Sequence, residues 1–178
     1  MNMKNTGSTT PGKVNIRIAE LHDLPAIVKI YNQAVPTYRS TANTTPATVE
    51  GRKTWFHEHE PHKHPIYVAE MNGEVIGWCS LSVYRPGRSA LRFTAEVSCY
   101  VDGNNQGQGV GRDLINHALD ASPSLGIKNV VAVLIDRNEA SRKMFEKLGF
   151  QQWGYLPRVL DFDGQECGEF YYGKRVVD

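Results

Sequence analysis

The sequence has few cysteines and no long apolar run. Its three cysteines, Cys79, Cys99 and Cys167, are odd in number and lack C-x-x-C spacing, which argues against both a disulfide framework and a thiolate zinc site. No segment reaches the roughly eighteen consecutive apolar residues of a membrane-spanning helix, and the polar N-terminus lacks the apolar core of a signal peptide. Reduced thiols in the cytoplasm are therefore expected.

Neither sign of charge is in excess. The 178 residues include 20 lysines and arginines against 19 aspartates and glutamates, for a formal net charge of +1. Proteins that bind nucleic acid or membrane surfaces usually carry a basic excess, so neither partner is expected. A hydrophobic content of 40% is ordinary for a globular protein of this length. We expect a disordered leader, residues 1–12, followed by a single domain, residues 13–178.

Hydrophobic periodicity predicts strands mixed with helices. Strands are expected at residues 14–18, 66–71, 75–83, 93–101, 130–135, 153–162 and 167–176. Helices are expected at residues 24–35, 48–59, 110–121 and from 138 to about 148. The apolar run at 130–135 does not alternate, which is typical of a central or parallel strand buried on both faces.

Single residues refine these predictions at the helices. Asp23 is expected to cap the first helix, and Gly149 is expected to end the last one in the left-handed conformation. In the second helix, Val49, Trp55 and Phe56 are expected to be buried.

A cluster of histidines follows the second helix, with His57, His59, His62 and His64 in the space of eight residues. Imidazoles at close spacing can bind zinc or nickel. However, two prolines and interleaved charges are typical of a solvated loop, and no cysteine stands nearby to complete a ligand set. We therefore expect no metal site.

The junction between the predicted strand at 93–101 and the helix at 110–121 is rich in glycine. Gly107, Gly109 and Gly111 allow sharp turns, and the first N–H groups of the helix that follows are free to bind phosphate. The junction lacks the Gly-Lys-Ser/Thr ending of a P-loop, and its G-x-G-x-G spacing differs from the dinucleotide fingerprint G-x-G-x-x-G. A different phosphate-bearing ligand is implied.

Glu96 is the acidic residue of the strand before this junction. One interpretation pairs it with a cross-strand arginine on an exposed face. The other makes it a general base, because a carboxylate among valine, alanine and cysteine just before a phosphate loop is suited to that role. The second interpretation is favoured.

Two motifs resemble the GCN5-related N-acetyltransferases (GNAT). Gln106–Gly111 is similar to their Q/R-x-x-G-x-G/A pyrophosphate loop, and Asn138–Ser141 with Phe145–Phe150 is similar to their N-x-x-S and F-x-x-x-G-F motif. The resemblance implies an α/β (α+β) fold: a mixed, mostly antiparallel, twisted sheet of about six to seven strands, splayed between the fourth and fifth, with about four helices. The segments at 30–32, 54–56, 94–101 and 129–133 look most like the phosphinothricin acetyltransferase subgroup.

The resemblance also implies an activity. Members of the subgroup use acetyl-CoA to acetylate small amino acids such as phosphinothricin, methionine sulfoximine or methionine sulfone, and many are homodimers. Glu96 would deprotonate the amine, directly or through a water, and an N–H near Val101 would stabilise the oxyanion. The residues implied to bind acetyl-CoA are Cys99, Tyr100, Val101, Gln106, Gly107, Gln108, Gly109, Val110, Gly111, Arg112, Asn138 and Ser141.

The acceptor side of the site is less defined. Arg85, Arg88 and Arg92 precede the strand of Glu96, and Arg85 or Arg92 would bind the substrate carboxylate. Phe145 stands where many members have a tyrosine that protonates the leaving thiolate. Phenylalanine cannot donate a proton, so either water or Tyr100 would protonate the thiolate, or no acid would be needed. A protein N-terminus or lysine as acceptor, or a non-catalytic acyl-CoA sensor, are the alternatives.

Overall fold

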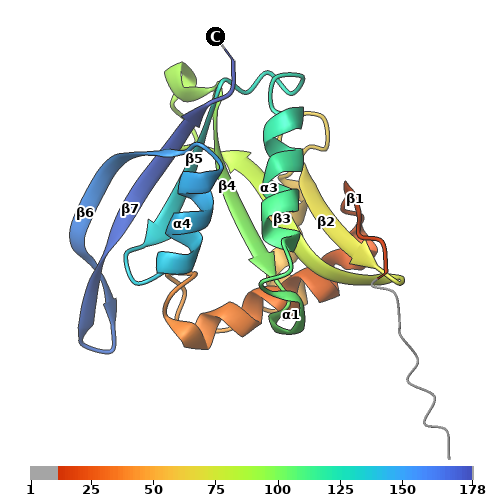
Figure 1. The fold of residues 1–178 in the computed structure, drawn as a ribbon, viewed down its shortest axis with the longest axis horizontal. Coiled ribbons are helices and arrows are strands. Elements are labelled where there is room, and N and C mark those ends of the chain that lie inside the picture. The colour runs from red at the N-terminus through yellow and green to blue at the C-terminus, as the bar shows by residue number, and fades with distance from the viewer. Residues whose placement is uncertain (1–11, 178) are drawn as a thin grey trace, which may run out of the picture.

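The computed structural model describes residues 12–177, so the expected leader, apart from Gly12, lies outside it. Within this range the strands are β1 (Asn15–Ile18), β2 (Ile66–Met71), β3 (Glu74–Val83), β4 (Thr94–Val101), β5 (Asn129–Ile135), β6 (Gln151–Phe162) and β7 (Gln165–Arg175). The α-helices are α1 (Leu24–Ala34), α2 (Val49–His57), α3 (Val110–Ala121) and α4 (Glu139–Lys147) (Figure 1). These bounds agree with the predicted elements to within a few residues.

The strands form one seven-stranded sheet in the order β1-β2-β3-β4-β5-β7-β6. The pair β4–β5 is parallel and the other pairs are antiparallel, which confirms the mixed sheet that the sequence resemblance implied. β5 is central, as its unbroken apolar run predicted. The last hairpin folds back so that β7, rather than β6, pairs with β5.

The pairing of β4 with β5 is short. It comprises Thr94 with Asn129, Ala95 with Val130 and Glu96 with Val131, and it stops there. Beyond this point β4 runs on to Val101 along β3, and β5 runs on to Ile135 along β7. The two strands therefore diverge toward their C-terminal ends (Figure 1). We call the space between them the wedge, and Glu96 stands at its apex.

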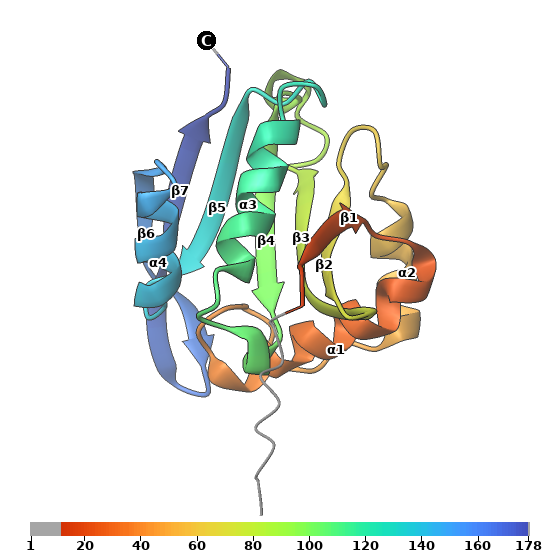
Figure 2. The ribbon, with the colours of Figure 1, turned by 45° about the vertical axis from the view of Figure 1, so that its right-hand side comes forward.

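The two faces of the sheet are covered differently. α3 and α4 lie against one face, where Leu114, Ile115 and Phe145 are buried against side chains from β4 and β5 (Figure 2). A second apolar cluster joins α1 to Trp78 and Val68 on β3 and β2. Side chains alternate along each strand, so Ala95 and Val97 face α3 whereas Glu96, Ser98 and Tyr100 share the face of Trp78.

Three expectations about the first half of the chain are wrong in detail. Asp23 makes no capping bond to α1, because its carboxylate is held by Arg17 and by the backbone N–H of Glu20. In α2, Trp55 and Phe56 are half-buried against the α1 cluster, as expected, but Val49 is 37% exposed. His59 is not solvated: its ring nitrogens contact the Trp55 carbonyl oxygen at 2.7 Å and Ser82 Oγ at 2.9 Å.

Residues 12–177 lack both a metal-binding cluster and a membrane-spanning helix. No group of three or more histidine, cysteine, aspartate or glutamate side chains in this range is arranged to hold a metal ion. Over the same residues, no helix has both the length and the apolar character required to cross a membrane.

The Arg17–Asp23 pair predicts a pH-dependent contribution to stability. Asp23 is 3% exposed, and Arg17 donates to both of its carboxylate oxygens, at 2.7 and 2.9 Å. Burial raises the pKa of Asp23, but the bonds from Arg17 and Glu20 outweigh it and leave the pKa below its ordinary value. Asp23→Ala should lower the free energy of unfolding by about 2 kcal/mol at pH 7. The loss is not larger because Arg17 is partly exposed, so water can solvate its charge when Asp23 is removed.

Urea unfolding at several pH values measures this contribution. Because the folded-state pKa is depressed, the stabilisation is present above the ordinary aspartate pKa and disappears as the pH falls through the folded value. The difference between the wild type and Asp23→Ala should therefore shrink below about pH 4. Asp120→Ala, at an exposed position on α3, is the control. An equal loss of stability at both positions would contradict the assignment.

Candidate active site

The glycine-rich junction forms a tight turn at the start of α3. Gly107 and Gly109 have φ values of 74° and 88°, in the region that glycine tolerates best. Gly109 is the N-cap of α3, and a Cβ atom there would lie 3.0 Å from Arg112 Nη2. The first N–H groups of an α-helix have no intrahelical acceptor, so those of Val110 and Gly111 are available to an anion together with the helix dipole.

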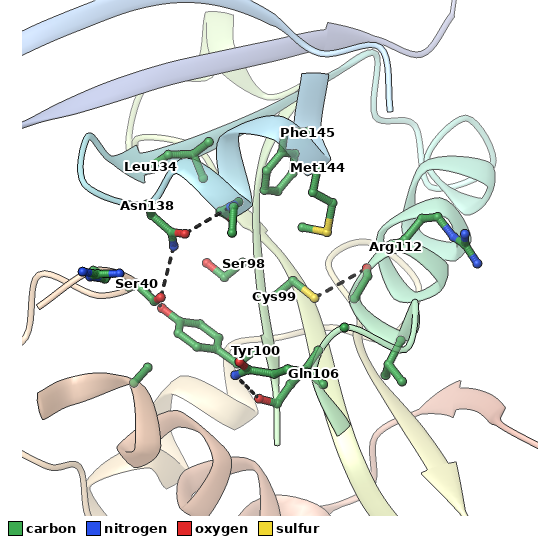
Figure 3. A pocket seen from close by; sticks show the side chains of 18 of the residues that line it. Ser40, Ser98, Cys99, Tyr100, Gln106, Arg112, Leu134, Asn138, Met144 and Phe145 are labelled. Atoms are coloured by element: carbon green, nitrogen blue, oxygen red, sulfur yellow. Dashed lines mark hydrogen bonds between the residues drawn. The ribbon is translucent and has the colours of Figure 1, made fainter. Parts of the chain in front are cut away.

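A cavity of about 930 Å³ extends from this turn into the wedge and along α4 (Figure 3). It brings together all but one of the residues predicted to bind acetyl-CoA. Those that line it are Cys99, Tyr100, Val101, Gln106, Gly107, Gly109, Val110, Gly111, Arg112, Asn138 and Ser141. Gln108 is not in the lining, and its amide donates to the Asn104 carbonyl oxygen at 3.2 Å.

The loop after α1 also reaches the cavity, which the sequence did not indicate. Ser40 lines the cavity and joins three parts of the chain. Its carbonyl oxygen accepts from the Tyr100 hydroxyl at 2.9 Å, and its Oγ accepts from Asn138 Nδ2 at 3.1 Å (Figure 3). Asn138 Oδ1 in turn accepts from the Ser141 N–H at 3.1 Å and caps α4. The second motif is thus tied to a loop about a hundred residues away in sequence.

Neither Phe145 nor Tyr100 is well placed to protonate the leaving thiolate. Phe145 is buried at the cavity wall, in edge-to-face contact with Phe150 at 4.9 Å. The Tyr100 hydroxyl, already bonded to Ser40, has a pKa raised first by burial and then by Tyr31. A higher pKa makes Tyr100 a weaker proton donor.

Glu96 lies at the apex of the wedge. Its neighbours across the sheet are Ser82 on β3 and Val131 on β5, so the cross-strand arginine of the alternative interpretation is not present. The side chain is half-buried, and it lies on the same face as Ser98, the next residue on that face and part of the cavity lining. Burial raises the pKa of Glu96, and the charge of Glu169 raises it further. Both effects make Glu96 a stronger base than an ordinary glutamate.

The loop arginines differ in their surroundings, and none of them lines the cavity. Arg92 donates to the Ser89 carbonyl oxygen at 3.1 Å and packs over the Phe93 ring at 4.2 Å. Arg85 has a φ of 51°, unusual for a residue other than glycine. Arg85 follows the end of β3 by two residues, and Ser82 near that end pairs with Glu96. Its side chain is exposed.

The sequence model of the acetyltransferase (GNAT) family matches residues 27–150 of the chain, which include the wedge, the glycine turn and α4. The chain belongs to the GNAT family.

The relatives of this GNAT protein lie in the phosphinothricin acetyltransferase-like subgroup. It is 42% identical over 153 residues to the Bacillus subtilis protein YwnH, whose designation as a phosphinothricin acetyltransferase is provisional; the match covers 85% of this chain and 93% of that protein. It is 34% identical over 157 residues to the L-methionine sulfoximine/L-methionine sulfone acetyltransferase of Pseudomonas aeruginosa, covering 88% of each. YncA of Salmonella typhimurium, solved with acetyl-CoA, has a TM-score of 0.87 at 29% identity, over 93% of this chain and 95% of that one.

This GNAT protein is an acetyl-CoA-dependent N-acetyltransferase. The cavity has features that suit the cosubstrate: the glycine turn and the start of α3 offer N–H donors for a pyrophosphate, and the wedge continues from them as far as the Glu96 side of the sheet. Side chains of α4 and of the loop after α1 also line the cavity.

Proposed function

We propose that this acetyltransferase acts on the amino group of a small amino acid or analogue of the phosphinothricin, methionine sulfoximine or methionine sulfone type. The position of Glu96 carries the proposal, because a half-buried carboxylate with a raised pKa stands at the apex of the wedge that holds the cosubstrate residues. The named activities of the relatives support the acceptor class.

The proposed mechanism uses the chain's own groups at fixed places. Acetyl-CoA, when bound, supplies the acetyl group as a thioester. The backbone of β4 beyond Glu96 has no partner strand on the β5 side, so an N–H near Val101 is available to the carbonyl oxygen of the acyl group. Glu96 takes a proton from the acceptor amine, directly or through a water, which makes the amine nucleophilic.

Arg85 is the better candidate for the acceptor carboxylate. It follows the end of β3, where Ser82 pairs with Glu96, and its side chain is exposed, whereas the Arg92 side chain is engaged by Ser89 and Phe93. Arg85→Ala should raise the KM for the amino acid about tenfold, the effect of losing one charge-assisted interaction. Arg92→Ala is the comparison. A larger effect at Arg92 would reverse the assignment, and no effect at either would remove both from the acceptor site.

Thiol release from acetyl-CoA over a panel of amino acids tests the acceptor class. Methionine sulfone, methionine sulfoximine and phosphinothricin should be the best acceptors. Preference for a peptide N-terminus or lysine would favour a protein acetyltransferase, and stabilisation by acetyl-CoA without any acetylated amine would favour a sensor. A cytoplasmic homodimer is part of the proposal, and light scattering measures the assembly.

A further inference from the structure

The strand order places a second carboxylate on the acceptor side of the wedge. Glu169 of β7 pairs with Ile135 of β5, and Glu96 of β4 pairs with Val131 of the same strand. Side chains of laterally paired residues share a face, and residues at even spacing along a strand do too. Glu169 and Glu96 therefore lie on one face, Glu96 at the apex of the wedge and Glu169 on the strand beyond β5, level with a β5 residue four positions further along.

The surroundings of Glu169 lack a structural partner for its charge. Its side chain is half-buried, and burial raises its pKa. Neither Glu169 nor Glu96 forms a hydrogen bond or an ion pair with another side chain in the part of the chain that the structure describes. Removing an ionised carboxylate from water costs free energy unless a cation or a hydrogen-bond donor pairs with it. A cation that arrives with the substrate would supply the missing partner.

Other charged and titratable groups also face Glu96. Tyr171 of β7 lies between Glu169 and the apex, and Tyr84 and Arg85 follow the end of β3. His59 reaches the same side through Ser82, and burial lowers its pKa, which favours the neutral ring at pH 7. This face of the sheet thus carries two carboxylates, Glu96 and Glu169, and the loop after β3 carries one arginine, Arg85. This pattern is complementary to a zwitterionic α-amino acid.

We propose that Glu169 is a specificity-determining residue that binds the ammonium group of the incoming amino acid, opposite Glu96. The ammonium can donate directly to Glu169 while a water links it to Glu96, which lies two strands away and four residues back along β5. Glu169 then orients the amine, while Glu96 removes the proton. This inference rests on the proposed function, because it requires an acceptor that arrives as an amino acid with a protonated amine.

Steady-state kinetics of Glu169→Gln tests the inference, with methionine sulfone as the varied substrate. We expect the KM to rise about tenfold and kcat to change little, as for the loss of one charge-assisted hydrogen bond in binding. A competitive inhibitor that lacks the amino group, the matching deaminated acid, should keep its inhibition constant. In addition, the acidic limb of kcat/KM should move to lower pH, because the like charge that raises the pKa of Glu96 is gone.

The controls separate the possible outcomes. Glu50→Gln, at an exposed position on α2, should change none of these quantities, and Glu169→Asp should recover part of the affinity. An unchanged KM and pH limb in Glu169→Gln, with the wild type active on methionine sulfone, would overturn this inference and leave the proposed function standing. A wild type inactive on every amino acid would overturn both. If Glu169→Gln does not fold, the same measurements on Glu169→Asp decide, with wild-type values overturning the inference.

Discussion

Glu96→Gln should lower kcat by about 100-fold or more, the usual contribution of a positioned general base. The amide keeps the size of the side chain but cannot accept a proton from the amine. Acetyl-CoA binding should be unchanged, because Glu96 lies outside the lining of the cosubstrate cavity. The fold should also be retained, since the substitution removes a half-buried carboxylate whose ionised form is disfavoured by burial.

Turnover, thermal unfolding and pH profiles together measure this effect. In the wild type, kcat/KM should fall on the acidic side as Glu96 gains a proton, at a pH above that of an ordinary glutamate. This limb should be lost in Glu96→Gln. Glu50→Gln is again the matched control. Wild-type turnover in Glu96→Gln would remove Glu96 from the mechanism and require another base.

Gly109→Val should abolish the thermal stabilisation by acetyl-CoA. The residue has a φ of 88°, where a β-branched side chain is strained, and its Cβ would lie 3.0 Å from Arg112 Nη2. Relief of this strain moves the turn and the first N–H groups of α3 away from the phosphate position. A ligand at 100 times its Kd stabilises a protein by about 2.7 kcal/mol. We expect that stabilisation to disappear.

Gly126→Val separates strain from loss of binding. Gly126 has a φ of 77° in the connection between α3 and β5, with open space around its Cβ position and no place in the cavity lining. Its substitution should strain the backbone to a similar degree, yet leave the stabilisation by acetyl-CoA intact. Binding that survives in Gly109→Val would mean that the glycine turn does not hold the cosubstrate.

The wedge would allow the two proposed ligand sites to share one sheet. The cosubstrate residues enter it from β4, from the turn before α3 and from α4. Glu96, Tyr171 and Glu169 lie on the face of the sheet that also carries Ser98 and Tyr100 of the cavity lining. A reaction between two bound molecules needs such an opening, because a continuous ladder between β4 and β5 would leave no space between the strands for the acyl group.

Patterns of residues close in sequence were enough to predict most of the strands and helices and the position of the glycine turn. Alternation and helical spacing located the strands and helices, since each depends on residues close in sequence. The glycine turn could also be recognised, because glycines between a strand and a helix have a local meaning. The same reasoning failed at Asp23 and His59, whose partners Arg17 and Ser82 come from other elements.

Only the tertiary structure shows which strands and loops lie beside Glu96. Periodicity shows which residues share a face of a strand, but it does not show which strand is its neighbour. The insertion of β7 beside β5 brings Glu169 to the face of Glu96, and the fold of the loop after α1 brings Ser40 to Asn138. These contacts form between segments far apart in sequence, because burial and strand pairing are satisfied over the whole sheet. The glycine turn and Glu96 could therefore be singled out from the sequence, whereas the neighbours of Glu96 on β7 and the contacts of Ser40 could not.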